Sequence, residues 1–409
     1  MHKLWQKLGS IVAIAVMAGI LAGPATQPAL AAQTGPTTWT VLVGGEAQIS
    51  QQPDGPAGAW QFMRFYPETI TINAGDTVVW KLNSAEFHTV TFPVPGQKAP
   101  DFIVPEGGDS QRLIANPLAA FPQGGATYDP TVYTNSGLLS RAPGSPQEYK
   151  LTFDKPGDYA YLCAVHAMMQ GHVIVQETGK AYPKTQAQYD ADAKAQLASD
   201  TAAAAKLEAG ASAVVTEPGP NGTTTYQVKI GAGYGTSAWM RFGPTDLTIH
   251  VGDTVEWVQN DVEAPHTVTF ASGQTPPEDI LPEPQSSGPP KLVFNPEVLA
   301  PAGGNTYSGT SLFNSGLLQG TKSPAPGPRT YSLVFDQPGT YQYVCTLHDG
   351  MGMKGTITVV AQGAPITLPV TGGSLPYGGL LTPGLLALAA LAIAAVVAGL
   401  LITRRHAQP

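Results

Sequence analysis

Two short segments of this sequence place a cysteine, a histidine and methionines at spacings suited to binding a metal. Cys163 is followed three residues later by His166, and Cys345 is followed three residues later by His348. These are the only two cysteines among 409 residues. One disulfide between them is compatible with an exported protein, and each thiolate is also a potential metal ligand. The count alone leaves a bridge, free thiols and metal binding open.

A second histidine lies upstream of each cysteine, at the start of a β-branched run. These are His88 in the first half and His266 in the second. A thiolate, two imidazoles and a thioether form the ligand set of a blue-copper site, in which one Cys and two His lie in a plane with a weak axial Met. A structural zinc site would normally use four Cys or His ligands and no Met. We therefore expect one copper site in each half.

The two halves are copies of one unit. Three motifs recur in the same order, namely GDTVVW at Gly75 and GDTVEW at Gly252, HTVTF at His88 and His266, and NSGLL at Asn135 and Asn314. Such internal similarity indicates a tandem duplication. The two cysteines then occupy equivalent positions in separate domains, which makes a bridge between them sterically improbable.

The positions of the candidate ligands imply β-structure around them. Short β-branched runs such as 69–72 and 77–80 are separated by Gly-Asp turns and predict short strands. About seven strands in each unit indicate a β-sandwich. Long Gly- and Pro-rich inserts cover about 93–131 and 271–310, while the Ala-rich segment 183–209 predicts a helix. With few large apolar residues, this helix is expected to be a solvated spacer.

Both units resemble cupredoxins, the plastocyanin and amicyanin family of small copper proteins. Unit one has the C-x2-H-x2-M spacing of amicyanin, and unit two has the C-x2-H-x4-M spacing of plastocyanin. The resemblance implies two type-1 copper ions per chain, held by His88, Cys163, His166 and Met169 in site 1 and by His266, Cys345, His348 and Met353 in site 2. Met351 competes with Met353, because it alone repeats the spacing of unit one.

The resemblance also carries expectations about the surroundings of each site. His166 and His348 would be the partly exposed ligands through which electrons pass, with Met168 in the docking patch around them. Thr89 and Thr267 stand where the family usually has Asn. A Thr hydroxyl is expected to make one bond between the ligand loops where an Asn side chain makes two.

Histidine usage favours an electron carrier over an enzyme. The trinuclear cluster of multicopper oxidases takes eight His, typically in H-x-H pairs, and no such pair occurs here. Beyond the proposed ligands and the two histidines near the chain ends, only His172 and His250 remain. We therefore expect a blue-copper electron-transfer protein that serves redox partner proteins. The alternative is a surface protein for copper storage or delivery.

Both ends of the chain carry targeting signals. A basic start, an apolar run and an A-x-A pattern predict a signal peptide over 1–32. Near the other end, the LPVTG motif, an apolar span and a basic tail resemble a sortase sorting signal, although a plain membrane anchor fits as well. The motif residues are Leu368, Pro369, Val370, Thr371 and Gly372. The body of the protein is expected at the cell surface, on the outer face of the membrane or in the cell wall.

These features define an all-β protein of two cupredoxin-like Greek-key β-sandwiches joined by an Ala-rich helical linker. The predicted divisions are a signal peptide (1–32), domain 1 (37–178), the linker (179–213), domain 2 (214–362), the sorting motif and spacer (363–379), a transmembrane helix (380–403) and a cytoplasmic tail (404–409). The formal net charge of −8 and the lack of Lys/Arg-rich runs argue against nucleic acid as a partner.

Overall fold

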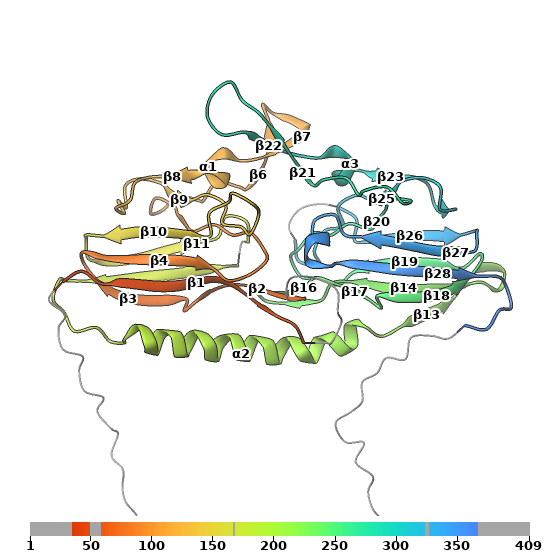
Figure 1. Cartoon of the computed structure of the whole chain (residues 1–409), viewed down its shortest axis with the longest axis horizontal. Helices are drawn as coiled ribbons and strands as arrows, with labels where there is room; N and C mark the ends of the chain where they lie inside the picture. Colours follow the sequence, from red (N-terminus) through yellow and green to blue (C-terminus); the bar gives the residue numbers. More distant parts are fainter. Residues whose placement is uncertain (1–34, 50–58, 167, 324–326, 367–409) are drawn as a thin grey trace, which may run out of the picture.

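The computed structural model describes residues 35–49, 59–166, 168–323 and 327–366 (Figure 1). The predicted signal peptide, the LPVTG motif, the apolar span and the basic tail lie outside these residues. Within the described ranges, no helix combines the length and the apolar character needed to cross a membrane.

The first domain is a sandwich of two sheets, as the β-branched runs predicted. One sheet has the order β10-β4-β1-β2, and the other has the order β3-β12-β11-β5-β9-β8. The strands of the first sheet are β1 (Thr38–Ala47), β2 (Trp60–Tyr66), β4 (Asp76–Leu82) and β10 (Glu148–Phe153). Those of the second are β3 (Thr69–Asn73), β5 (Thr91–Phe92), β8 (Pro122–Gln123), β9 (Thr134–Ser136), β11 (Gly157–Leu162) and β12 (Gln170–Gln176).

The second domain repeats this architecture. Its sheets have the orders β13-β14-β19-β26-β24, with β17 beside β14, and β18-β28-β27-β20-β25-β23. The strands of the first are β13 (Val215–Pro218), β14 (Thr224–Ile230), β17 (Phe242–Gly243), β19 (Thr254–Gln259), β24 (Thr306–Tyr307) and β26 (Thr330–Phe335). Those of the second are β18 (Asp246–His250), β20 (Thr269–Phe270), β23 (Pro301–Ala302), β25 (Phe313–Ser315), β27 (Gly339–Val344) and β28 (Lys354–Val360).

An aromatic cluster fills the core between the two sheets of each domain. Trp80 is fully buried and meets Tyr161 with ring centroids 5.4 Å apart, and the equivalent Trp257 meets Tyr343 at 5.3 Å. Large buried rings supply much of the apolar area that stabilises a sandwich. The duplication seen in the sequence therefore extends to the packing of the two cores.

Helix α2 (Gln186–Ala211) joins the domains and begins at a capping box made by Thr185 and Gln188. It is not the solvated spacer expected from its composition. One face is buried along both domains, against β1 and β2 on one side and β15 (Gly233–Tyr234) and β16 (Ser237–Trp239) on the other (Figure 1). The buried stripe includes Tyr189, Ala193, Asp200, Ala204 and Glu208. Because Asp200 and Glu208 lie on this buried face, the sequence of the helix does not show a clear apolar stripe.

Those two acids are satisfied by partners on β2. Asp200 Oδ2 accepts a hydrogen bond of 2.7 Å from the Tyr66 hydroxyl, and Glu208 Oε2 accepts one of 2.7 Å from Nε1 of Trp60. Buried polar groups are stable when they are paired in this way. The helix is thus a structural element of the first domain as well as a connection.

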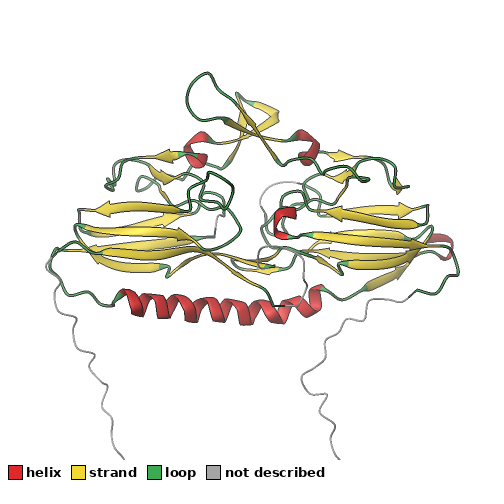
Figure 2. Cartoon of the chain, viewed as in Figure 1, coloured by secondary structure: helices red, strands yellow, loops and turns green. Residues whose placement is uncertain are grey.

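The long inserts meet above the two domains. Strands β6 (Ile103–Glu106) and β7 (Asp109–Ala115) come from the first insert, and β21 (Ile280–Glu283) and β22 (Lys291–Phe294) from the second. Together they form the sheet β21-β22-β7-β6, called here the interdomain sheet. Short helices α1 (Pro117–Ala120) and α3 (Pro296–Leu299) lead back from it into the sandwiches (Figure 2). The inserts, whose role the sequence did not indicate, link the domains.

A third connection lies between the sandwiches. Strand β16 of the second domain pairs with β2, so it extends a sheet of the first domain. The domains are therefore held together by α2 below, by β16 in the middle and by the interdomain sheet above (Figure 1). The short 3-10 turns η1 (Pro220–Gly222) and η2 (Asp349–Met351) complete the described helical elements.

Candidate metal centres

One cysteine and two histidines converge in each domain. In the first centre, Cys163 Sγ lies 3.5 Å from Nδ1 of His166 and 3.9 Å from Nδ1 of His88, and the two Nδ1 atoms are 3.1 Å apart.

The second centre has the same arrangement. Cys345 Sγ lies 3.3 Å from Nδ1 of His348 and 3.7 Å from Nδ1 of His266, and the two Nδ1 atoms are 3.0 Å apart. Both cysteines are free thiols, so a bridge between them is not formed.

These separations suit ligands of a single metal ion. Bonds of about 2.0 Å to nitrogen and 2.3 Å to sulfur place neighbouring ligand atoms roughly 3–4 Å apart. Each set pairs a soft thiolate with two imidazoles and contains no carboxylate, a combination suited to copper or zinc and not to magnesium or calcium. The chemistry of the donors therefore fits copper in both domains.

The loop after β11 supplies most of the first centre. Cys163 follows the strand directly, and Met169 precedes β12. The Cys163 amide donates to the Met169 carbonyl at 2.9 Å, and the Met169 amide donates to the His166 carbonyl at 2.9 Å. His88 comes from a different segment and is held by backbone hydrogen bonds of 3.0 and 2.8 Å with Leu139.

The second loop identifies the methionine that is equivalent to Met169. The Cys345 amide donates to the Met353 carbonyl at 3.0 Å, as Cys163 does to Met169. Met353 and Met169 are both fully buried in the same cores as their cysteines. Met351 instead joins the apolar cluster of the first domain, and its carbonyl accepts a bond of 2.7 Å from Arg241. The geometry therefore favours Met353 over Met351 as the axial candidate.

Thr89 ties the two ligand segments together through its hydroxyl and its amide, whereas the Thr267 hydroxyl exceeds the one bond expected of it, because it contacts both the amide and the hydroxyl of Thr346. Its Oγ1 accepts a hydrogen bond of 2.7 Å from the Ala164 amide, and its own amide donates to Cys163 Sγ at 3.3 Å. The hydroxyl is also 2.8 Å from that of Thr91, which donates to Asn135 Oδ1 at 2.8 Å. Since the Thr91 proton goes to Asn135, the Thr89 hydroxyl has two acceptors for its proton, Thr91 Oγ1 at 2.8 Å and Cys163 Sγ at 3.9 Å.

Asn135 and Ser136 explain why the NSGLL motif is repeated. The Asn135 amide donates to the carbonyls of Leu118, Ala119 and Phe121, which fixes the end of α1 beside the site. Ser136 Oγ accepts from the Val90 amide at 2.8 Å. Asn314 and Ser315 repeat these contacts in the second domain. The repeat was the only sequence signal for this supporting network.

One glycine in each domain provides space for the upstream histidine of its centre. Gly44 has φ +73°, and a Cβ at this position would lie 2.6 Å from Nε2 of His88. Gly231 has φ +66°, and its Cβ would lie 3.2 Å from Nε2 of His266. Glycine alone combines this left-handed backbone with such a close approach.

Both cysteines are poised as thiolates. Burial alone would raise the pKa of each thiol, but the charges and hydrogen bonds of the neighbouring imidazoles outweigh burial and hold the pKa of Cys163 and Cys345 well below the ordinary value. The same pairing raises the pKa of His166 and, more strongly, of His348, against the effect of burial. A thiolate is the form that binds a metal.

The outer nitrogens of the histidines have different partners in the two centres. His88 Nε2 lies 2.8 Å from the Ser84 hydroxyl, whereas His266 Nε2 lies 3.8 Å from the Asp261 carboxylate. Burial lowers the pKa of His88. For His266, burial acts in the same direction, but Asp261 and Cys345 outweigh it and raise the pKa. No motif in the sequence pointed to Ser84 or Asp261.

His348 meets a carboxylate from the other domain. Its Nε2 lies 3.3 Å from Oε1 of Glu86, which is itself buried. Burial alone would raise the pKa of Glu86, yet its bond to His348 and the nearby imidazoles lower it to about 2. The expectation that His348 is partly exposed is wrong, because only 7% of its surface is accessible and the loop that carries Glu86 covers it.

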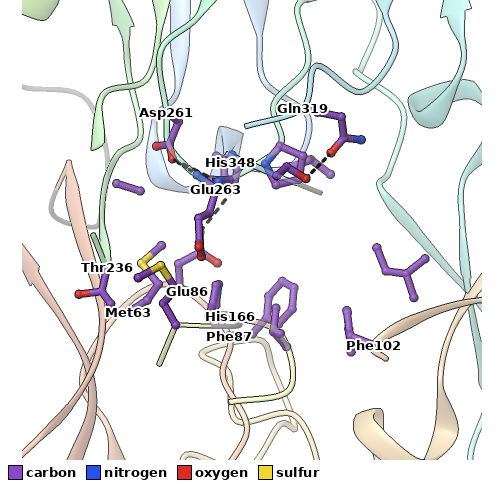
Figure 3. A pocket seen from close by; sticks show the side chains of 18 of the residues that line it. Met63, Glu86, Phe87, Phe102, His166, Thr236, Asp261, Glu263, Gln319 and His348 are labelled. Carbon is purple, nitrogen blue, oxygen red and sulfur yellow. Dashed lines mark hydrogen bonds and ion pairs between the residues drawn. The ribbon is translucent and has the colours of Figure 1, made fainter. Parts of the chain in front are cut away.

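A pocket of about 360 Å³ lies between the domains, and both centres border it (Figure 3). His166 and His348 line it from opposite domains, together with the aromatic side chains of Phe87, Phe102 and Phe294. Met168, expected in a docking patch, is half exposed and lines the same pocket. His166 is partly exposed and His348 is buried, and both histidines border the same interdomain pocket.

Comparison with known proteins places these observations in context. The family described as "Copper binding proteins, plastocyanin/azurin family" matches residues 56–176 and 226–360. Plastocyanin from Scenedesmus fuscus is 35% identical over 132 residues, which are 32% of this chain and 96% of that protein. Plastocyanin from Nostoc punctiforme is 35% identical over 136 residues, or 33% of this chain and 73% of that protein.

Similar solved structures include an amicyanin and a plastocyanin. One is a methionine-to-alanine mutant of amicyanin with Cu(I), at 24% identity and a TM-score of 0.19, covering 33% of this chain and 80% of the other. The second is oxidised plastocyanin from Dryopteris crassirhizoma, at 22% identity and a TM-score of 0.19, covering 34% of this chain and 99% of the other.

Proposed function

Since this chain belongs to the copper-binding plastocyanin/azurin family, we propose that it is an extracytoplasmic electron-transfer protein with two type-1 copper ions. The observation that carries the proposal is the repetition of one buried Cys-His-His group, with nearly equal distances, in both domains. Copper in such a site shuttles between Cu(II) and Cu(I) and so accepts or releases one electron.

Each proposed site uses four residues. His88, Cys163 and His166 would hold the first ion with Met169 as the weak axial ligand, and His266, Cys345, His348 and Met353 would hold the second. Complete burial of both cysteines and of both axial candidates keeps water away from the ion. The hydrogen-bond networks of Thr89 and Thr267 hold the ligand loops in place, which favours electron transfer with little rearrangement.

Among the described residues, the two histidines outside the proposed sites support a carrier over a substrate-converting enzyme. His172 lies on β12 with its Nδ1 2.9 Å from Asp158, and His250 ends β18 with its Nε2 2.8 Å from the Ala364 carbonyl. Neither contacts the pocket between the centres. A second type of copper site would need several additional imidazoles together.

The proposed location is the outer face of the cell envelope. Its support is the sequence alone, through the signal peptide over 1–32, the apolar span over 380–403 and the LPVTG motif that contains Thr371. Attachment to the wall through Thr371 and retention by the membrane span are both compatible with this location. Redox partner proteins would then meet the molecule outside the cytoplasm.

Copper loading of single-cysteine variants tests the function. The purified protein should bind two copper ions, measured by elemental analysis, and show the intense visible thiolate-to-copper band that bleaches reversibly on reduction. Cys163→Ser and Cys345→Ser should each remove one ion and about half of the colour, whereas His172→Ala should remove neither. A colourless protein that releases copper to a weak chelator would instead indicate storage or delivery.

A further inference from the structure

The two centres occupy fixed positions on one pocket. His166 and His348 reach it from opposite domains, and Glu86 and Glu263 lie between them (Figure 3). Helix α2, the pairing of β16 with β2 and the interdomain sheet hold the domains together around this pocket. The separation between the centres is therefore set by the fold and not by a flexible linker.

One side chain provides a short route between the ligand sets. Glu86 precedes His88 by two residues, and its Oε1 lies 3.3 Å from Nε2 of His348. Two residues of chain span at most about 7 Å. Electron tunnelling weakens steeply with distance, and more so across gaps than along bonds. The route from His88 through Glu86 to His348 contains a single gap.

The second centre has carboxylates at both of its outer nitrogens. Asp261 lies 3.8 Å from Nε2 of His266, and Glu86 lies 3.3 Å from Nε2 of His348. Both acids are almost completely buried, at 1% and 4% exposure. Their charges therefore act in a medium where they are screened far less than in water.

The first centre has weaker contacts with carboxylates, because Glu86 acts on His88 and His166 only through space. The outer nitrogen of His88 meets the neutral Ser84 hydroxyl. Among the residues that the structure describes, no carboxylate forms an ion pair with His88 or His166. Glu263 also borders the pocket and acts on His166 through space, without forming an ion pair with it.

Negative charge next to a ligand favours the oxidised ion. The Cu(II)-thiolate unit carries one more positive charge than the Cu(I)-thiolate unit, so a nearby carboxylate stabilises it. This effect lowers the reduction potential, and it is strongest at the second centre, where Asp261 and Glu86 form ion pairs with the ligating histidines.

We propose that Asp261 and Glu86 give the second centre a lower reduction potential than the first, so that one electron passes inside the chain from the second centre to the first. This inference rests on the proposed function. In the step, the reduced ion of the second centre loses one electron and the oxidised ion of the first gains it, with no bond broken and no proton moved. An external redox protein supplies the electron, and another removes it.

Variants that retain a single centre test whether the second centre has the lower reduction potential. Cys345→Ser retains the first centre and Cys163→Ser the second, and each is titrated by its visible band. At the midpoint of the second centre, the first should be at least tenfold more reduced, which for one electron corresponds to about 59 mV. Equal or inverted potentials would overturn the inference, while colourless variants would refute the proposed function instead.

Substitution of the side chains next to the outer histidine nitrogens tests whether Asp261 and Glu86 lower the reduction potential of the second centre. In the Cys163→Ser background, Asp261→Ser and Glu86→Gln should each raise the potential of the second centre. In the Cys345→Ser background, the reciprocal change Ser84→Asp should lower that of the first. Asp261→Asn provides a second variant of similar shape in case Asp261→Ser fails to fold. Unchanged potentials in folded, blue variants would overturn the roles of both carboxylates.

Half-reduction of the two-centre protein tests internal transfer. After photoreduction by one electron, its EPR spectrum should match that of oxidised Cys163→Ser, since the second centre remains Cu(II). The approach to this state should be first order and independent of protein concentration, and slower in Glu86→Ala. A rate proportional to protein concentration, or a spectrum matching oxidised Cys345→Ser, would overturn the proposal.

Discussion

The rings of Phe102 and Phe294, one from each domain, meet edge to face with their centroids 6.2 Å apart. Both are nearly buried and belong to one apolar cluster that also contains residues beside the first centre. Both line the pocket that the two centres share. This contact joins the roof of the pocket to the interdomain sheet, so the stability of the domain arrangement can be measured there.

We expect Phe102→Ala and Phe294→Ala to lower the free energy of unfolding by about 3 kcal/mol each. A double-mutant cycle should give a coupling of about 0.5–1.5 kcal/mol, typical of aromatic pairs. Urea denaturation of the copper-free protein measures both the single losses and their coupling. Strictly additive losses would show that the rings do not stabilise each other.

The axial assignment predicts different outcomes for two neighbouring methionines. In the Cys163→Ser background, Met353→Leu should change the EPR and visible spectra of the second centre and raise its potential, because loss of a weak sulfur donor destabilises Cu(II). Met351→Leu should leave both unchanged. Each substitution conserves volume and should cost less than about 1.5 kcal/mol of stability. The reverse pattern would assign Met351 as the ligand.

The Thr89 hydroxyl is predicted to contribute to the free energy of unfolding of the copper-free protein. Thr89→Val keeps the shape but leaves the partly buried Ala164 amide without its acceptor, which should cost about 1 kcal/mol in the copper-free protein. Thr89→Ser retains the hydroxyl and should lose less. Thermal and urea unfolding measure the difference, and equal stability of the Val and Ser variants would contradict the role of this bond.

The Cys345-His348 pair predicts a plateau in the pH dependence of stability of the copper-free protein. The pKa of Cys345 is lowered and that of His348 is raised from ordinary values of 9.0 and 6.5. Between these values the folded ion pair and the unfolded neutral pair bind the same number of protons, so stability is flat.

Outside the plateau, stability should fall on both sides. Below pH 6.5 the unfolded imidazole takes up a proton, and above pH 9.0 the unfolded thiol loses one. Each flank then contributes a slope of about 1.4 kcal/mol per pH unit. Cys345→Ser removes this pair's contribution and should make both flanks shallower, while the Cys163-His166 pair still contributes, as measured by urea unfolding across this range. Flanks that persist unchanged in the variant would argue against the ion pair.

The local pattern of the sequence determined the strands, the duplication and the residues that converge on each centre. Strand periodicity and the Cys-x2-His spacing are short-range features, because one hairpin loop brings Cys163, His166 and Met169 together. The upstream histidines were identified by their place in a repeated motif. Family membership and the convergence of one Cys and two His in each domain agree with the predicted copper sites.

Only the tertiary structure decided how the centres relate to each other. The contact of Glu86 with His348 joins residues from different domains, and the pairing of Ile114 with Val293 joins two inserts without a recognisable pattern. Helix α2 was misread as solvated because its buried face contains Asp200 and Glu208, whose partners lie on a distant strand. Such contacts depend on domain docking, since the complementary surfaces are assembled from segments far apart in the chain.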